Sequence, residues 1–262
     1  MVWIAGGQFT MGSDHAYQEE APARKVRVDG FWIDKHEVTN AEFAEFVKET
    51  GYKTVAERNI NKKAFPEADP SLLQAGSAVF SPPKKITSTK NYFQWWKFVP
   101  GANWKHPQGP ESSIKGRENH PVVHIAFEDA QAFATWAKKE LPTEAQWEFA
   151  AAGQVIENNQ ANTWQGEFPL KNSKIDGFKG AAPVKSYTPN KFGLYDMLGN
   201  VWEWTKTSSN SSQDLIKVIK GGSFLCAPNY CMRYRPSARF SQDAGLGTNH
   251  IGFRTVLNVS KR

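Results

Sequence analysis

Two cysteines are the residues of this sequence best suited to chemistry. Cys226 and Cys231 lie five positions apart with Pro228-Asn229 between them, a pair of residues typical of a turn. Such a turn can bring both sulfurs to one side, and nearby cations such as Arg233 favour the thiolate form. Two thiolates without imidazole or carboxylate partners suit a soft ion, with copper(I) the best candidate, and they leave room for a third thiolate from a substrate. From spacing alone, a disulfide across the turn or two buried thiols stay open as alternatives, since a free cysteine is commonly a buried small apolar residue.

Oxygen-bearing side chains form the second candidate group. Asp196 and Glu203 stand in one loop-like block, which Asn162, Asp176 and Asn190 precede. Carboxylate, amide and loop carbonyl oxygens are the ligands that Ca²⁺ prefers, at six to eight coordination. The spacing is not that of an EF-hand. The alternative is that these residues hold loops together through Asx turns.

Several other chemistries are excluded by what the sequence lacks. It contains no G-x-S-x-G, P-loop, G-x-G-x-x-G or H-E-x-x-H motif. Two cysteines are too few for a secreted disulfide framework or for a zinc ribbon or finger. The scattered histidines are interpreted as core or loop residues; they are His106, His120, His124 and His250.

Three helices are expected to position these groups. Thr39 and Glu42 form a capping box for a helix over residues 40–50. Residues 128–139 show a second apolar stripe. A third helix begins after Pro142, where Thr143 and Gln146 again fit a capping box.

The remaining chain is expected to be short strands and long loops. Residues 26–33 alternate as one strand, whereas residues 53–118 and 154–200 show no clean period. No linker divides the sequence, so residues 1–262 are predicted to be a single α+β domain with little regular secondary structure. Loops of this length indicate a function or an organising ion.

Composition limits the partners. The net charge of +6 is mild. The densest basic run, residues 84–90, is interpreted as a solvated loop, so no nucleic acid is expected. No apolar window is long enough to span a membrane. No signal peptide opens the sequence, which favours a cytoplasmic protein, or a periplasmic one if a leader has been removed.

Nearly the whole chain resembles the formylglycine-generating enzymes, also called sulfatase-modifying factors. The Leu-Pro-Thr-Glu-Ala block at residues 141–145 and the Gly-Asn-Val-Trp-Glu-Trp block at residues 199–204 are shared by a broad superfamily that includes proteins without this activity. The Gly-Gly-Ser-Phe-Leu-Cys…Tyr-Cys-x-Arg-Tyr-Arg block at residues 221–235 resembles the catalytic, bacterial-type members. Further matching blocks are residues 6–13, 37–40, 101–104, 120–124, 162–169 and 252–254.

The resemblance implies a fold and an activity. The fold would be a C-type-lectin-like variant stabilised by calcium. The activity would be oxidation, with O₂, of a cysteine in a Cys-x-Pro-x-Arg segment of an unfolded sulfatase to Cα-formylglycine. The protein would act as a monomer, with copper(I) and Ca²⁺ as cofactors.

Residue roles follow from the same resemblance, position by position. Cys226 and Cys231 would bind copper, with Ser223 and Trp202 beside them as catalytic residues. Substrate contacts would be Trp104, Tyr230 and Arg235. One calcium ion would take Asn162, the Thr163 carbonyl, Asp176 and the Phe178 carbonyl; the other would take Asp196, Glu203 and the carbonyls of Gly199 and Val201.

The sequence also departs from the family pattern. The stretch after Gly153 is shortened, Ala227-Pro228-Asn229 replaces a more polar trio, and residues 241–249 replace another loop. Two alternatives therefore stay open. One is a non-catalytic, calcium-stabilised C-type-lectin-like binding module, and the other is an oxidase of the same fold that acts on another peptide.

Overall fold

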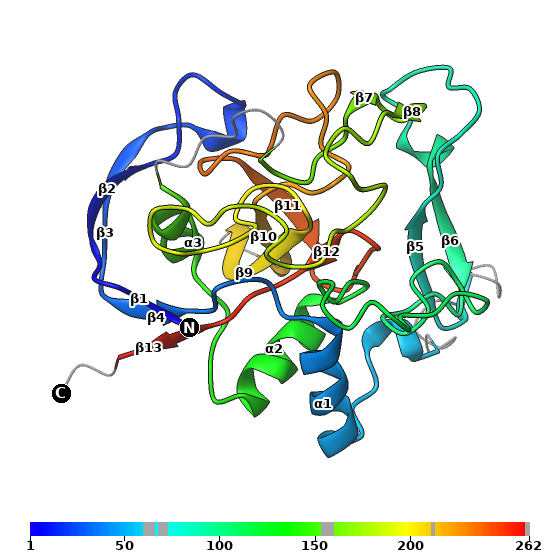
Figure 1. The fold of residues 1–262 in the computed structure, drawn as a ribbon, viewed down its shortest axis with the longest axis horizontal. Coiled ribbons are helices and arrows are strands. Elements are labelled where there is room, and N and C mark those ends of the chain that lie inside the picture. The colour runs from blue at the N-terminus through cyan, green and yellow to red at the C-terminus, as the bar shows by residue number, and fades with distance from the viewer. Residues whose placement is uncertain (60–65, 68–72, 153–159, 211–212, 260–262) are drawn as a thin grey trace.

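Short strands and long loops dominate the protein (Figure 1). The computed structural model describes residues 1–59, 66–67, 73–152, 160–210 and 213–259. The α-helices are α1 (Asn40–Thr50), α2 (Phe127–Trp136) and α3 (Glu144–Ala151), and the 3₁₀ turns include η1 (Gln18–Glu20), η2 (Val55–Glu57) and η5 (Tyr92–Gln94). The strands are β1 (Val2–Ile4), β2 (Gly7–Met11), β3 (Arg24–Val28), β4 (Phe31–Ile33), β5 (Gly76–Phe80), β6 (Trp96–Pro100), β7 (Gly166–Glu167), β8 (Lys171–Asn172), β9 (Trp202–Asn210), β10 (Gln213–Lys220), β11 (Arg239–Asp243), β12 (Ile251–Gly252) and β13 (Val256–Asn258).

The two helices with predicted capping boxes begin where the sequence indicated. In α1, the Glu42 backbone N–H donates to Thr39 Oγ1 at 3.3 Å, and the Thr39 N–H donates to Glu42 Oε2 at 2.7 Å. Thr143 and Gln146 make the same reciprocal pair before α3. Each box satisfies two backbone donors that the first helical turn leaves unpaired. Helix α1 ends at Thr50, and Gly51 caps it with a φ of +66°, which glycine readily adopts.

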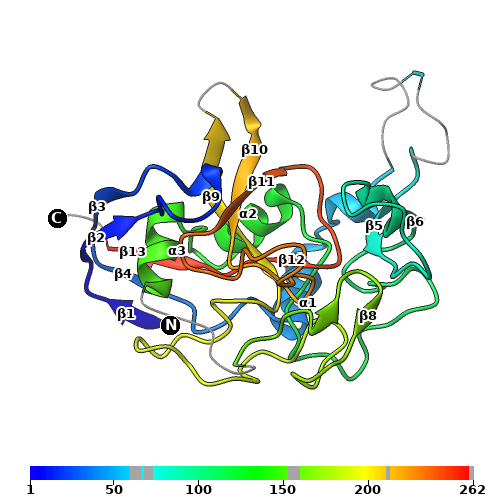
Figure 2. The same cartoon turned by 90° about the horizontal axis from the view of Figure 1, so that it is seen from above.

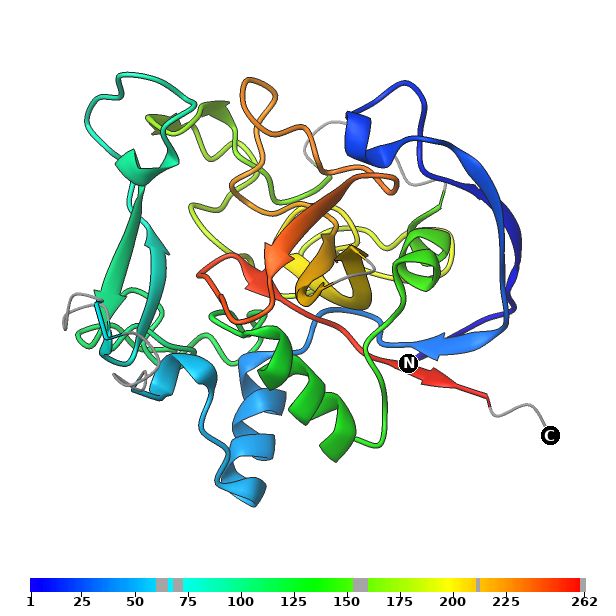
Figure 3. The ribbon, with the colours of Figure 1, turned by 180° about the vertical axis from the view of Figure 1, so that it is seen from behind.

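Helix α2 is shorter than predicted. It ends at Trp136 rather than at residue 139, because Lys138 takes a left-handed φ of +57° and redirects the chain. Phe133 and Ala134, which belong to the predicted apolar stripe of residues 128–139, are buried in the core. Figure 3 shows α1 and α2 side by side below the central sheet.

The central sheet has the strand order β11-β10-β9-β12. Strands β9, β10 and β11 pair antiparallel, and β12 joins the other edge of β9 in parallel, with Ile251 opposite Trp202. The loop that follows β10 carries both cysteines. The sheet therefore fixes the start of the candidate site.

The single strand predicted over residues 26–33 is wrong. Residues 24–28 form β3, which pairs with β2, and residues 31–33 form β4, which pairs with β1 and β13 in another sheet. The break falls at Gly30, where a Cβ would lie 2.5 Å from the Trp3 ring. A side chain there would collide with the Trp3 indole on β1, so the position between β3 and β4 requires glycine.

The β5–β6 hairpin stands at the edge opposite β2 and β3 (Figures 1 and 2). The sequence did not predict this hairpin, because it lies inside residues 53–118, which show no clean period. Ser77 Oγ donates to the Gly247 carbonyl at 2.7 Å, and the Phe80 N–H donates to Asn249 Oδ1 at 3.1 Å. These buried bonds attach the hairpin to the loop before β12.

Three apolar clusters hold the loops in place. One joins α1, α2 and the central sheet and includes Cys226; another joins α3 to β1, β3, β4 and β13. The third joins the β5–β6 hairpin to the residues on either side of Cys226, among them Phe224 and Ala227. Among the described residues, no helix is long and apolar enough to cross a membrane.

Candidate active site around Cys226 and Cys231

Two glycines shape the turn that leaves β10. Gly221 and Gly222 have φ values of +95° and +76°, a region that costs other residues energy. A Cβ on Gly222 would lie 3.0 Å from the Arg233 carbonyl oxygen and 3.1 Å from Tyr234 Cα. The backbone on the far side of Cys231 therefore packs directly on this turn.

The predicted turn brings the two sulfurs together. The Cys226 N–H donates to the Ser223 carbonyl at 2.9 Å, and the Cys231 N–H donates to the Ala227 carbonyl at 2.9 Å. The two Sγ atoms lie 3.1 Å apart, and both cysteines are free thiols. The two cysteines therefore form no disulfide in this structure, and their sulfurs lie side by side.

The two thiols have different acidities. Burial raises the pKa of Cys226 well above its ordinary value, because its side chain is 2 % exposed. The hydrogen bond from the Cys226 thiol lowers the pKa of Cys231 to about 6, and the backbone N–H and guanidinium of Arg233 add to that effect. Cys231, the less buried of the two, is therefore the more acidic thiol.

The 17–20 segment clamps the chain that follows Cys231. The Tyr17 hydroxyl accepts the Met232 N–H at 3.2 Å, and the Arg233 guanidinium lies 4.0 Å above the Tyr17 ring. Arg233 also pairs with Glu19 at 2.5 Å. These contacts span more than two hundred residues of sequence and fix the side of the turn that carries Cys231.

Arg235, predicted to contact substrate, takes part in the same clamp. Its Nη2 lies 2.5 Å from Glu20 Oε1, and its Nε donates to the Met232 carbonyl. Glu20 is buried and also accepts the Ser237 hydroxyl at 2.7 Å. In this structure Arg235 is therefore engaged by the protein itself.

Tyr230, a second predicted substrate residue, lies in an aromatic wall beside the cysteines. Its ring stacks on Phe168 with centroids 4.5 Å apart and meets the Trp95 ring at 5.6 Å. The side chain of Tyr230 is 39 % exposed. It therefore offers an accessible ring face one residue from Cys231.

The other predicted site residues are buried near the turn. Ser223 is fully buried, and its hydroxyl accepts the Leu225 N–H at 3.2 Å. Trp202 packs in the same apolar cluster as Cys226. Trp104 belongs to that cluster too, but it is 3 % exposed, and its indole N–H donates to Glu57 at 3.3 Å. Trp104 thus offers little surface to a substrate in this conformation.

The first predicted calcium set is brought together. Asp176 accepts the Thr163 and Phe178 backbone N–H groups, both at 3.1 Å. Burial raises the pKa of Asp176. The Asn162 amide nitrogen donates to the Gly180 carbonyl at 2.9 Å, which fixes the orientation of that side chain. The four predicted ligand residues therefore lie within one hydrogen-bonded loop pair.

The second predicted calcium set lies in a buried acidic cluster. Glu203 is fully buried and forms two 2.7 Å bonds with Arg254. Asp196 lies close enough to Glu203 and Glu37 that their charges interact. Burial raises the pKa of Asp196 to about 6, and burial together with Asp196 raises the pKa of Glu37 well above its usual range. Three carboxylates thus face one guanidinium.

Glu37 is a member of this cluster that sequence reasoning missed. Its Oε1 accepts the Asn200 amide at 3.0 Å, while its buried Oε2 has no hydrogen-bond partner among the described residues. An orphaned carboxylate oxygen beside surplus negative charge is the environment that a divalent cation stabilises. Glu37 lies 163 positions from Asn200, so no local pattern could have assigned it.

The predicted metal sites are not clusters made only of side chains. Within the described ranges, no group of three or more His, Cys, Asp or Glu side chains is arranged to hold a metal. Both predicted calcium sets rely on backbone carbonyls, and the predicted copper site has only two side-chain ligands, so neither would form such a group. The shortened stretch after Gly153 falls at residues 153–159, outside the described residues.

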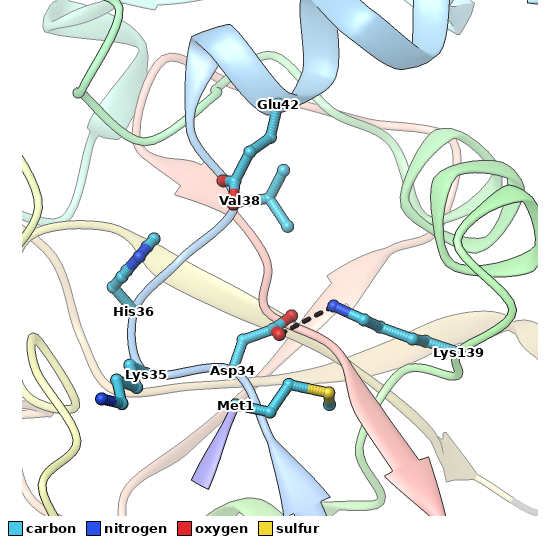
Figure 4. Close-up of a pocket in the computed structure, with 7 residues that line it drawn as sticks. All are labelled: Met1, Asp34, Lys35, His36, Val38, Glu42 and Lys139. Carbon is cyan, nitrogen blue, oxygen red and sulfur yellow. Dashed lines mark hydrogen bonds and ion pairs between the residues drawn. The ribbon is translucent and has the colours of Figure 1, made fainter.

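A separate pocket of about 250 Å³ lies between β4 and α1 (Figure 4). An ion pair of 2.8 Å joins Lys139 to Asp34 across it. The pocket does not include either cysteine. Its lining residues are Met1, Asp34, Lys35, His36, Val38, Glu42 and Lys139.

The fold defines the class of the protein. It matches the solved structure of PvdO from Pseudomonas aeruginosa, with a TM-score of 0.63, 21% identity, and coverage of 97% of this chain and 92% of that one. At this identity the likeness establishes only the α+β fold with little regular structure that the sequence predicted.

The chain belongs to the family described as "Sulfatase-modifying factor enzyme 1-like domain", which matches residues 1–259. It is 43% identical to a "Formylglycine-generating enzyme" of Mycobacterium tuberculosis, over 98% of this chain and 97% of that protein. It is also 36% identical to an "Inactive C-alpha-formylglycine-generating enzyme 2" of Mus musculus, over 100% of this chain and 86% of that protein. The family therefore includes inactive members, and the activity has to be argued from the site.

Proposed function

We propose that this protein is a formylglycine-generating oxidase that acts on sulfatases. It would convert the cysteine of a Cys-x-Pro-x-Arg segment, in an unfolded sulfatase polypeptide, to Cα-formylglycine with O₂ as the oxidant. The observation that carries the proposal is the pair of free sulfurs 3.1 Å apart, with the half-buried one beside an exposed tyrosine. We also propose that the protein acts as a monomer.

Cys226 and Cys231 would hold copper(I) in this enzyme. A thiolate and a thiol that loses its proton on binding form a soft donor pair, and the described site adds no competing imidazole. When bound, copper(I) would supply O₂ activation and a binding position for the thiolate of the substrate cysteine.

Residues around the two cysteines would assist binding of copper(I) and of the substrate. Arg233 stabilises the Cys231 thiolate, and its pairing with Glu19 keeps the guanidinium in place. Buried Ser223 and Trp202 line the inner side of the turn and exclude bulk water from it. Tyr230 presents a ring face on the outer side, where a proline or aliphatic group of the substrate can pack.

Two calcium ions would stabilise the loops around this centre. The support is the orphaned Glu37 oxygen and the surplus carboxylate charge at Asp196 and Glu203, together with the half-buried Asp176 in the other loop pair. Calcium would neutralise these charges and so stabilise loops that have little regular secondary structure. Its role would be structural, because the predicted ligands and the cysteines form separate groups.

Mass spectrometry of a peptide tests the proposed reaction. A peptide with a Cys-x-Pro-x-Arg core is incubated with the protein, copper(I), a thiol reductant and air. The expected product is lighter than the starting peptide, because sulfur leaves as sulfide and an aldehyde oxygen takes its place. The aldehyde is then captured with a hydroxylamine to confirm its chemistry.

Single variants provide the control. Cys226→Ala and Cys231→Ala should each abolish turnover and lose copper(I) to a coloured chelator, while near-ultraviolet circular dichroism shows an intact fold. Full activity in either variant would refute the two-sulfur site. If the mass of every tested peptide stays unchanged while the peptide binds, the protein is a binding module. If only peptides without the core change mass, it is an oxidase for another substrate.

A further inference from the structure

We propose that the exposed face of the β5–β6 hairpin and its loop docks acidic residues of the substrate polypeptide, outside the Cys-x-Pro-x-Arg core. This inference rests on the proposed function and adds to it a preference for substrate segments of negative charge. The surface consists of the side chains of Lys84, Lys85, Lys90, Lys97, Tyr92 and Phe93, and we call it the lysine wall.

The lysine wall has an unbalanced charge. Residues 70–110 contain five lysines and no Asp or Glu. All four lysines of the wall are exposed. Within the described part of the chain, no carboxylate lies in ion-pair distance of any of them, whereas Lys105, just beyond the hairpin, pairs with Glu57. Exposed cations without ion-pair partners, gathered in one segment of the fold, attract an anionic partner.

The wall is continuous with the candidate active site. Trp95 lies in the hairpin between the exposed loop and β6, and its ring contacts the Tyr230 ring, one residue from Cys231. The inner face of the hairpin shares an apolar cluster with Phe224 and Leu225, which directly precede Cys226. In Figure 1 the hairpin stands beside the β7–β8 turn, at the same end as the loop that follows β10. A polypeptide with its cysteine at the sulfurs can therefore continue across the wall.

The loop that carries the lysines is held in one shape. The Thr87 N–H donates to Gln94 Oε1 at 2.7 Å, and Gln94 Nε2 donates to the carbonyls of Ser88 and Asn91. The Ser81 N–H donates to the Trp95 carbonyl at 2.8 Å, which closes the loop at its base. Charges on an ordered loop lose little freedom when a partner binds.

Aromatic rings add an apolar contact to this basic surface. Tyr92 and Phe93 are 51 % and 73 % exposed, and their ring centroids lie 4.5 Å apart. Large exposed rings beside unpaired lysines suit an extended chain that carries both acidic and apolar side chains. An unfolded polypeptide offers that mixture.

Peptides with one core and different flanks test the inference. Three peptides carry the same Cys-x-Pro-x-Arg core, extended on each side by acidic, neutral or basic residues. We expect kcat/KM to be about three- to tenfold higher for the acidic than for the neutral peptide at low salt, as exposed charge pairs allow. The difference should shrink as the salt concentration rises. Equal kcat/KM values for all three peptides would overturn the inference.

Binding provides a readout that does not depend on turnover. Fluorescence anisotropy with the same three peptides, their cysteine replaced by serine, should give the same ranking. If no core peptide is oxidised but the ranking in binding persists, the proposed reaction fails and the docking surface stands. If an oligonucleotide of equal charge displaces the acidic peptide at equal concentration, the surface is a nucleic-acid site and the inference is wrong.

Matched charge reversals locate the effect. Lys84→Glu/Lys85→Glu should reduce the ratio of acidic to neutral kcat/KM to about one or below. The control is Lys25→Glu/Lys48→Glu, which changes the net charge equally on β3 and α1, away from the hairpin. The control variant should keep the wild-type ratio. An equal loss in both variants would mean that net charge alone acts, and would refute a specific wall.

Discussion

The two cysteines differ in burial and in the acidity of their thiols. Cys226 is sealed in the core, where burial raises its thiol pKa, and it donates a hydrogen bond to Cys231. Cys231 is half-buried and accepts that bond, and Arg233 lowers the pKa of its thiol further. We therefore expect the more accessible sulfur, that of Cys231, to be the more reactive of the two.

Alkylation measures this asymmetry. In metal-free, reduced protein at pH 7.5, iodoacetamide should modify Cys231 at least about tenfold faster than Cys226, because only a thiolate attacks. The rate at Cys231 should rise with pH through about 6, the pKa that its environment favours. In Cys226→Ala the midpoint should move upward, because the donated hydrogen bond is lost. Peptide mapping after timed quenching gives both rates, and equal rates would contradict the assignment.

Lys220 is a second residue whose neighbours define its role. It is fully buried at the end of β10, where its Nζ lies 2.7 Å from Glu148 and 3.6 Å from Glu144. The pair connects α3 to the strand that leads into Gly221 and the cysteine turn. A buried ion pair of this kind specifies position more than it adds stability.

Breaking that pair should be costly. Lys220→Met should lower the free energy of unfolding by about 3–5 kcal/mol, because it leaves the buried Glu148 carboxylate without its cation. The matched control is Lys206→Met, whose pair with Glu140 at 2.5 Å is exposed. That change should cost at most about 1 kcal/mol. Urea titration compares the two variants, and similar losses would show that burial does not decide the effect.

At the level of elements, the sequence predicted those whose formation depends on neighbouring residues in the chain. Thr39 and Thr143 cap the helices that the sequence assigned to them, because a capping box needs only four residues. The split at Gly30 was missed, because β3 and β4 pair with strands of two different sheets, which the local sequence does not show. The β5–β6 hairpin was missed as well, since its two buried attachments join it to residues about 170 positions away.

The turn after β10 can be tested with two glycines. Gly222→Ala should destabilise the protein and weaken copper(I) binding, because its Cβ would press on the backbone of Arg233 and displace Cys231. Gly51→Ala is the matched control, since it also has a positive φ but no atom within 4 Å of a new Cβ. The control should cost only about 1–2 kcal/mol of backbone strain and leave copper binding unchanged. Unfolding curves and chelator competition distinguish the two.

At the scale of the whole molecule, buried charge has to be balanced between distant segments. The four charged residues of this cluster come from three separate parts of the chain: Glu37, the block that holds Asp196 and Glu203, and Arg254. Three of the four are carboxylates. Asp196 and Glu203 were predicted as calcium ligands because a family motif marks them. Glu37 and Arg254 were not predicted as members of this cluster, because they contact it only when distant parts of the chain fold together.

Calcium removal should expose this imbalance. A calcium chelator should lower the melting temperature, and added Ca²⁺ should restore it, because an ion that binds only the folded state stabilises it. In Glu37→Gln the chelated protein should be more stable than chelated wild type, whereas the gain from Ca²⁺ should be smaller. Differential scanning calorimetry with and without chelator gives both values. An unchanged melting temperature after chelation would refute the calcium proposal.

The indole of Trp147 gives this acidic cluster an optical readout. The ring is fully buried, its N–H donates to Glu203 Oε2 at 2.8 Å, and the Lys220 ammonium lies 5.9 Å from its centroid. A change in charge around Glu203 would alter the local field on this ring and shift its emission. Intrinsic fluorescence, with Trp147→Phe as the subtracted blank, can therefore follow ion uptake in unlabelled protein as it happens.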